Sequence, residues 1–348
     1  MSNSKLIIFV GLFHLILFPA CKTESNVSID VNLEHISSFG DFPSDGFITR
    51  SRSIDLDRFI YVADMGTSQI HQFNLDGEFI KSFGREGRGP GEFSGNINVF
   101  SANDSIFITD FSNFTVTTFK SNGEFVKSFD LEKRHSSEFQ KIQDSFIVGH
   151  SISHPFASDY FDQNLLHVYN EQGEIINSFG EFIHQGEDIP SIMQRFFTEV
   201  TEDKIHVVFF YFPIYRIYSI EGSLLSEMRL DSLVTFTDLA SNSQSELKQG
   251  MNGAEMVNLK GGIGGIQIVG EKVFMPIYDE IYHRIEEFKL INNSIEHIRS
   301  YRYPLESSNR TVIGYLDFVY SEERNSFYIL ENVMSRGVVV SEYRLIDN

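Results

Sequence analysis

Two histidines, His150 and His154, stand four positions apart and offer the nitrogen ligands that transition metals prefer. That spacing places two imidazoles on one side of a helix, but Pro155 follows directly and the stretch HSISHPF predicts a loop. The sequence has no H-E-x-x-H motif, no second cysteine and no Gly-x-Ser-x-Gly turn. It therefore favours neither a zinc centre nor a serine hydrolase.

The stretch GREGRGPGEF, residues 84–93, is rich enough in glycine to suggest a phosphate-binding loop. Such loops end in Gly-Lys-Ser/Thr and run into a helix whose N-terminus faces the phosphate. Here the stretch NINVFS, residues 96–101, follows and alternates like a strand. The glycines and Pro90 suit a sharp return of the backbone, so we interpret the stretch as a joint between two structural units.

The chain is acidic, with a formal net charge of −20 at pH 7. Nucleic-acid binding depends on lysine and arginine clusters that neutralise phosphates. No basic run interrupts the acidity of this sequence. We therefore expect no nucleic-acid partner.

The N-terminus, MSNSKLIIFVGLFHLILFPAC, has the composition of a secretory signal. Lys5 precedes an apolar run, Leu6 to Phe18, that is shorter than the ~20 residues of a membrane-spanning helix. The stretch FPAC resembles a bacterial lipobox and implies lipidation of Cys21, the only cysteine. We expect residues 1–20 to be a lipoprotein signal peptide, residues 21–30 a lipidated tether, and the protein an outer-membrane lipoprotein facing the periplasm or the medium. An ordinary signal peptide with an unrelated cysteine is the alternative.

A repeat runs through the rest of the chain. The stretches LDGEFIKSFG, SNGEFVKSFD and EQGEIINSFG each have a polar turn ending in glycine, an alternating strand and a final Ser-Phe, and IEGSLLSEMRL and INNSIEHIRSY are weaker copies. The marker glycines Gly77, Gly123, Gly173 and Gly222 recur at intervals of roughly 50 residues. Intervals of this size are typical of β-propeller blades of four strands each.

The repeats add up to six units. Short β-branched and aromatic runs such as RFIYVAD and SFYILE predict the strands between the markers. The fifth unit covers about 263–303, and the sixth, from Val312, has only three strands. Its missing outer strand is supplied by VNLEHISSFG, residues 31–40, which we expect to pair with the last unit and remove an open sheet edge. The predicted fold is all-β, one six-bladed β-propeller over residues 31–348.

Residues 59–93, FIYVADMGTSQIHQFNLDGEFIKSFGREGRGPGEF, resemble the NHL repeat. Together with the lipobox, the chain is similar to six-bladed NHL/TolB-like β-propeller lipoproteins of Bacteroidetes-type bacteria. The resemblance implies that Asp64 and its equivalent Asp110 bond to turn backbone. This sequence departs from the repeat where the family has Asn-x-Arg, because it has Ser68 and Gln69 there.

In propellers, the loops from each outer strand to the next inner strand share one face with the loops between the two middle strands, and ligands bind there. This face collects arginines and aromatic rings, which we interpret as a binding mouth; the alternative is that these rings fill gaps between blades. The candidates are Arg85, Arg88, His154, Tyr211, Tyr215, Tyr278, His283 and Arg336.

A calcium site is the competing hypothesis. Gluconolactonase-like and paraoxonase-like propellers hold calcium in the central channel with carboxylates and amides. In this chain four residues with such oxygens fall on predicted inner strands: Asn96, Asn98, Glu199 and Asp317.

The segment 231–262 breaks the repeat interval, and we expect it to be a lid, a partner contact or a neutral insertion. The sequence as a whole favours a non-catalytic, envelope-anchored binding or scaffold module that recognises a protein, peptide or glycan on its loop face. It would need no cofactor and would touch the membrane through its anchor alone. The alternative is a calcium-dependent hydrolase or lyase with its site in the channel.

Overall fold

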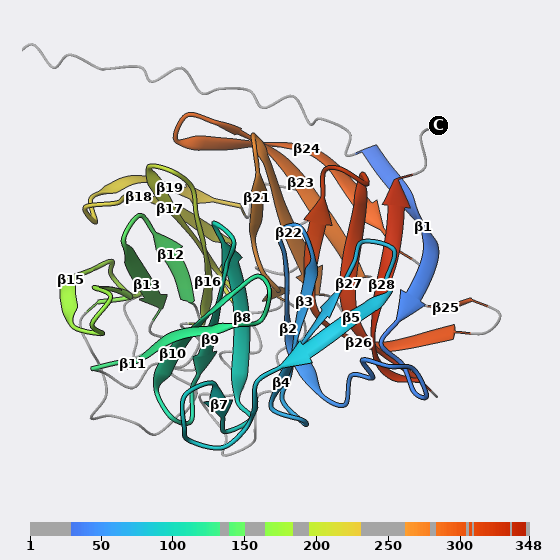
Figure 1. Ribbon diagram of the computed structural model, residues 1–348. Coiled ribbons are helices and arrows are strands. Elements are labelled where there is room, and N and C mark those ends of the chain that lie inside the picture. Colours follow the sequence, from blue (N-terminus) through green and yellow to red (C-terminus); the bar gives the residue numbers. More distant parts are fainter. Residues whose placement is uncertain are drawn as a thin grey trace, which may run out of the picture.

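A computed structural model describes residues 29–132, 139–149, 164–183, 195–230, 262–278, 283–303, 306–307, 310–334 and 336–345. Within these ranges, the side chains of residues 29, 278, 283, 306–307 and 310–316 are outside the description. Antiparallel sheets stand around a common axis as the blades of a six-bladed propeller, which confirms the predicted all-β class (Figure 1). Among the described residues, none forms a helix long and apolar enough to cross a membrane.

The first four blades are antiparallel sheets of four strands that follow one another in chain order. The first blade contains β2 (Ser51–Leu56), β3 (Ile60–Asp64), β4 (Gln69–Phe73) and β5 (Phe79–Phe83), and the second contains β8 (Ile97–Ala102), β9 (Ser105–Asp110), β10 (Thr115–Lys120) and β11 (Phe125–Asp130). The third contains β12 (Phe139–Ile142), β13 (Ser145–Gly149), β14 (Leu166–Tyr169) and β15 (Ile175–Phe179), and the fourth contains β16 (Phe196–Val200), β17 (Lys204–Phe209), β18 (Ile214–Ser219) and β19 (Leu224–Arg229).

The last two blades are joined into one ten-stranded sheet. The fifth contains the short inner strands β20 (Gly262–Ile263) and β21 (Gln267–Val269), then β22 (Lys272–Tyr278), β23 (His283–Ile291) and β24 (Ser294–Arg302). The sixth contains β26 (Arg310–Ser321), β27 (Ser326–Val333) and β28 (Gly337–Leu345), with β25 (Glu306–Ser307) paired to β26. The remaining strands are β1 (Ile29–Phe39) and the short parallel pair of β6 (Arg85–Glu86) and β7 (Glu92–Phe93).

Strand β1 closes the ring, as the sequence predicted. Its residues from Leu33 to Phe39 pair antiparallel with β28 and complete the sixth blade. Its first residues, Ile29 to Asn32, pair parallel with the outer strand β24 of the fifth blade, which the repeat pattern did not indicate. One strand therefore covers two sheet edges that would otherwise expose unpaired amides and carbonyls.

Apolar side chains of adjoining blades fill the space between them. Between the first two blades, Ile70 and Phe83 on one side meet Ile97 and Phe119 on the other, all of them buried. Burying a side chain of this size stabilises the fold by roughly 1.5–3 kcal/mol. The large share of phenylalanine in the sequence is thus used between sheets.

The two signatures of the repeat are partners across blade boundaries. Gly77, Gly123 and Gly222 have φ of 80°, 79° and 94°, a conformation that favours glycine. A Cβ on Gly222 would lie 2.5 Å from Phe179, the last residue of the preceding outer strand. Phe83 covers Gly123 in the same way, and Phe129, with the carbonyl of Asp130, covers Gly173. Phe39 of β1 covers Gly77, so the contact continues across the closure.

The fifth turn departs from this pattern. The weaker copy INNSIEHIRSY places Asn293 at the position of the marker glycines. Only two residues separate β23 from β24, however, and Asn292 adopts the positive φ, 56°. Asparagine tolerates this conformation better than other side chains. The fifth blade therefore has a tighter hairpin than the first four.

Each outer strand also carries a β-bulge at the same place, where one residue is left out of the pairing register. The bulged residue is aliphatic in all six blades and is exposed in five. Bulges at an edge strand twist it away from pairing with another chain. The bulged residues are Ile36, Ile80, Val126, Ile176, Leu225 and Ile298.

We expect Gly222→Ala to lower the free energy of unfolding by about 2–4 kcal/mol. The substitution places an alanine in a left-handed backbone conformation, and its Cβ clashes with Phe179. Gly270→Ala is the matched control, since Gly270 also has a positive φ, 60°, but nothing lies within 4 Å of its missing Cβ. The control should lose only about 1 kcal/mol. Urea denaturation of both variants measures the difference, and equal losses would contradict the contact.

Removing β1 should open the ring. A chain that begins at Asp41 loses the buried side chain of Leu33 and exposes the edges of β24 and β28, so we expect a loss of at least about 3 kcal/mol. Thermal denaturation of this chain and of a chain that begins at Ile29 measures the contribution of β1 alone. The closure is refuted if the two chains unfold at the same temperature.

Candidate functional site

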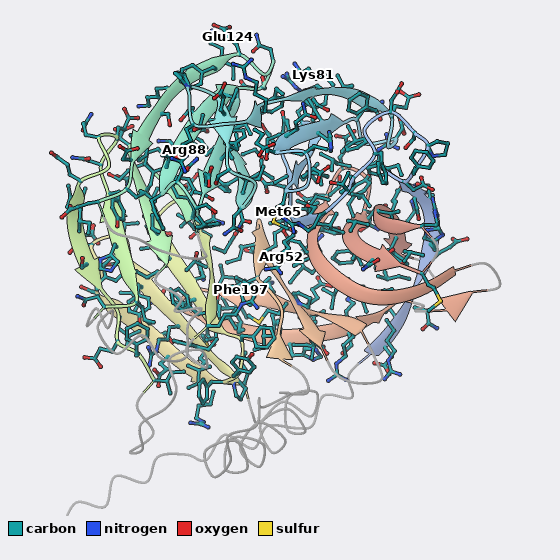
Figure 2. The ribbon with its side chains drawn as sticks, turned by 90° about the horizontal axis from the view of Figure 1, so that it is seen from below. Arg52, Met65, Lys81, Arg88, Glu124 and Phe197 are labelled. Atoms are coloured by element: carbon teal, nitrogen blue, oxygen red, sulfur yellow. The ribbon has the colours of Figure 1, made fainter. Side chains whose placement is uncertain are left out.

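The loops that follow the outer strands and those between the two middle strands lie together on one face, called the loop face below. Figure 2 views this face, with Arg88 over the second blade and Arg52, Met65 and Phe197 near the middle of the ring. Met65 belongs to the turn between β3 and β4, and Phe197 to the start of the inner strand β16. Side chains from different blades thus lie near the propeller axis on this face, in the region called the channel mouth below.

Buried aspartates build the loops of this face. The carboxylate of Asp64 accepts hydrogen bonds from the amides of Thr49, Arg50 and Gly66, from two hydroxyls, and from Nε2 of His71 at 3.3 Å. Burial alone would raise the pKa of Asp64, but the hydrogen bonds outweigh it and hold this pKa well below its usual range. Asp110 bonds in the same way to Ser94, Ser112 and Asn113, so the structural role implied for both aspartates is confirmed.

The glycine-rich loop is a joint whose amides face an internal carboxylate. Glu92 accepts hydrogen bonds from the amides of Arg88 at 3.1 Å and Gly89 at 2.8 Å, and from Nε of Arg85 at 2.8 Å. The amide of Gly89 and the guanidinium of Arg85 lower the pKa of Glu92. Any Cβ at Gly87 would collide with this carboxylate. Both arginines are exposed, but the Arg85 guanidinium is paired with Glu92 within the loop.

An arginine and three aromatic rings form a cluster at the fourth blade. The guanidinium of Arg195 lies 5.1 Å from the ring centres of both Phe197 and Phe210. Tyr211 packs edge-on against Phe210 with ring centres 4.4 Å apart. Burial raises the pKa of the Tyr211 hydroxyl, and the nearby charge of Arg195 opposes this. Tyr211, a predicted ligand-face residue, is thus half-buried at the edge of an arginine-aromatic cluster.

Tyr215 corrects the sequence interpretation, because it lies in the core and not on a loop. Strand β18 begins at Ile214, and the side chain of Tyr215 is fully buried between the fourth and fifth blades. Its hydroxyl is 2.6 Å from Nδ1 of His206, and burial lowers the pKa of that histidine to about 4. The pair is neutral at neutral pH and serves packing.

The other ligand-face candidates have different fates. Arg336 holds the carboxylate of Asp41 with Nε at 2.9 Å and a terminal nitrogen at 2.7 Å, which fastens the loop after β1 to the sixth blade. Tyr278 and His283 pair with each other at the ends of β22 and β23. Outside the described residues lie His150, His154, residues 1–28 with Cys21, and residues 231–261 of the predicted insertion.

Inner strands of neighbouring blades are joined by side chains. Val99 donates its amide to Ser53 Oγ at 3.0 Å, and Ser101 donates its amide and hydroxyl to Asp55. Across two further boundaries, Asp317 accepts the amide of Ile54 at 3.0 Å, and Gln267 accepts that of Tyr320 at 2.6 Å. Glu199 accepts from the amide of Ile268 at 3.5 Å and from Gln140 at 3.3 Å.

These contacts bear on the predicted calcium ligands. Glu199 and Asp317 each bond to the backbone of the next blade, and the carbonyl of Asn96 accepts the amide of Phe111 at 2.9 Å. Asn98 lies on β8, one residue after the start of the strand. Within the described ranges no three histidine, cysteine or acidic side chains converge as a metal site would require. Glu199 and Asp317 are thus engaged by the neighbouring blade, and calcium binding is left to the alternative hypothesis.

Burial raises the pKa of Asp55 from 3.8 to about 6, although the hydrogen bonds from Ser101 act in the opposite direction. The folded state then binds the proton of the Asp55 carboxyl more tightly than the unfolded chain does. The stability contributed by protonated Asp55 therefore falls as the pH rises from about 4 to about 6. We expect Asp55→Asn to remove up to about 3 kcal/mol of this decline. Urea denaturation from pH 4 to pH 7 measures it, with the exposed Asp45→Asn as control, and parallel curves for Asp55→Asn and wild type would contradict the assignment.

The fold and its closure define the class: a six-bladed β-propeller whose loop face carries an arginine-aromatic mouth. Residues 48–261 match the DUF5128 family, described as a 6-bladed beta-propeller. The chain belongs to this family. Among curated proteins, no sequence is similar enough to count as a relative.

Solved structures share the fold at low sequence identity. A Bacteroides fragilis protein named as exported is 15% identical, with a TM-score of 0.54 over 92% of this chain and 99% of its own. A DUF4221 family member from Bacteroides vulgatus is 12% identical, with a TM-score of 0.59 over 91% of this chain and 99% of its own. Virginiamycin B lyase from Staphylococcus aureus is 11% identical, with a TM-score of 0.48 over 90% of this chain and 99% of its own.

Proposed function

We propose that this protein is a non-catalytic binding module of the bacterial cell envelope, which recognises a protein, peptide or glycan on its loop face. The observation that carries the proposal is the presence of charged and aromatic side chains on the loop face. Arg88 is exposed, and Tyr211 borders the cluster of Arg195 with Phe197 and Phe210. Binding sites of this kind combine a rigid frame with charged and aromatic groups on loops.

The contacts of the channel carboxylates support binding over catalysis. Glu199 and Asp317, the acidic residues of the calcium hypothesis, accept amide hydrogen bonds that join neighbouring inner strands. A calcium ion would have to compete with those amides for the same oxygens. Both carboxylates thus have a structural role that needs no ligand.

Lipidation at Cys21, which we propose as the means of attachment, would give the loop face an orientation. Strand β1 runs toward the loop face, and its first residue, Ile29, lies at the opposite end of the propeller (Figure 1). Residues 21–28 could reach at most on the order of 25–30 Å. A propeller held by this end presents its loop face away from the membrane. The exported Bacteroides fragilis protein of the same fold is consistent with an envelope location.

We expect Arg88→Ala and Tyr211→Ala each to weaken capture of an envelope partner by about ten-fold, the loss typical of a contact residue. Capture is measured by cross-linking on cells that display the anchored protein. Lys120→Ala is the control, because Lys120 pairs with Glu124 on the opposite face.

Calorimetry with calcium on the same protein tests the alternative. Stoichiometric calcium uptake that disappears in Glu199→Gln and Asp317→Asn would replace the binding module with a calcium-dependent enzyme. The proposal also fails if Lys120→Ala reduces capture as much as Arg88→Ala does.

A further inference from the structure

The channel mouth on the loop face presents guanidinium groups, although the protein carries a formal net charge of −20. Arg52 is an exposed residue of β2, and Figure 2 shows it near the middle of the ring with Phe197. In the first blade, Arg52 follows Ser51, which pairs with Asp64 at the end of β3. In the fourth blade, Phe197 follows Phe196, which pairs with Phe209 at the end of β17. Arg52 and Phe197 therefore stand at the same level of the channel.

Arg195 directly precedes β16 and lies two residues before Phe197. Its guanidinium lies 5.1 Å from the ring centres of Phe197 and Phe210, a distance at which the faces of the rings attract a cation. The planar guanidinium keeps its N–H groups along its edge and can still pair with a carboxylate through two parallel hydrogen bonds. The rings thus fix the position of the charge without neutralising it.

Neither Arg52 nor Arg195 pairs with a carboxylate in the part of the chain that the structure describes. Other arginines of this protein do: Arg85 holds Glu92, Arg216 holds Glu227 and Arg336 holds Asp41. Two guanidinium groups near the propeller axis that have no carboxylate partner among the described residues attract an anionic group from outside.

We propose that Arg52 and Arg195 bind the carboxylate groups of an acidic peptide at the channel mouth. This rests on the proposed function and names its ligand class. A carboxylate matches the fork of N–H donors on a guanidinium. A sugar would need the open face of an aromatic ring, and here Arg195 lies over both Phe197 and Phe210. Acidic peptides therefore fit the mouth better than glycans do.

The test is titration of the whole protein with fluorescent hexaglutamate, with hexaglutamine as the uncharged probe and trigalacturonate as the acidic sugar. Wild type should bind hexaglutamate alone of the three, and more weakly at about 150 mM salt than at about 10 mM. Arg52→Gln and Arg195→Gln should each weaken binding about ten-fold or more, as for loss of a charge-assisted hydrogen bond. Arg324→Gln is the matched control, because Arg324 pairs with Asp76 on the opposite face.

Equal binding of hexaglutamate by Arg52→Gln, Arg195→Gln and wild type overturns the proposal, as does equal binding of hexaglutamine. Preference for trigalacturonate replaces the peptide with an acidic glycan and also overturns it. Thermal denaturation of each variant shows whether a loss of binding reflects unfolding, and Arg52→Gln should not unfold because Arg52 is exposed. The titration uses no envelope partner and leaves Arg88 and Tyr211 intact, so its result is separate from the capture experiment.

Discussion

Adjacent blades are aligned by a phenylalanine that packs on a glycine. The phenylalanine ends the outer strand of one blade, and the glycine lies in the hairpin of the next blade. Examples are Phe83 with Gly123 and Phe179 with Gly222. A ring of blades closes only if neighbouring sheets meet at similar angles, and a repeated contact provides this. The glycine satisfies two demands at once, since its backbone has a positive φ and its missing Cβ leaves room for the ring. The Ser-Phe and glycine signatures therefore recur together.

The inner ends of the blades are held by a different kind of contact. Inner strands of neighbouring blades do not pair through their backbones, so free amides would face the channel. Asp317 and Glu199 accept such amides from the next blade. Polar residues on inner strands are thus explained by the need to satisfy the backbone, and an acidic residue there is weak support for a metal. The arginines of the mouth have no such internal role among the described residues.

The sequence predicted the features that depend on local pattern and spacing: the strands, the six units, and the closing strand supplied by residues 31–40. It did not predict the fate of Tyr215, because one more residue in the loop before β18 would turn that side chain outward. It also missed the pairing of Ile29–Asn32 with β24, which depends on how two blades meet. Arg52 and Arg195 carry no motif, since their meaning comes from the convergence of separate inner strands.

The double pairing of β1 has a mechanical consequence. A force applied to residue 29 along the strand direction acts parallel to β1, and its hydrogen bonds to β24 and β28 are perpendicular or slanted to that strand. Such a force loads the bonds in shear, so many must break together. A sideways force would open them one at a time, beginning at Ile29. The ring should therefore resist traction along its N-terminal strand far better than peeling.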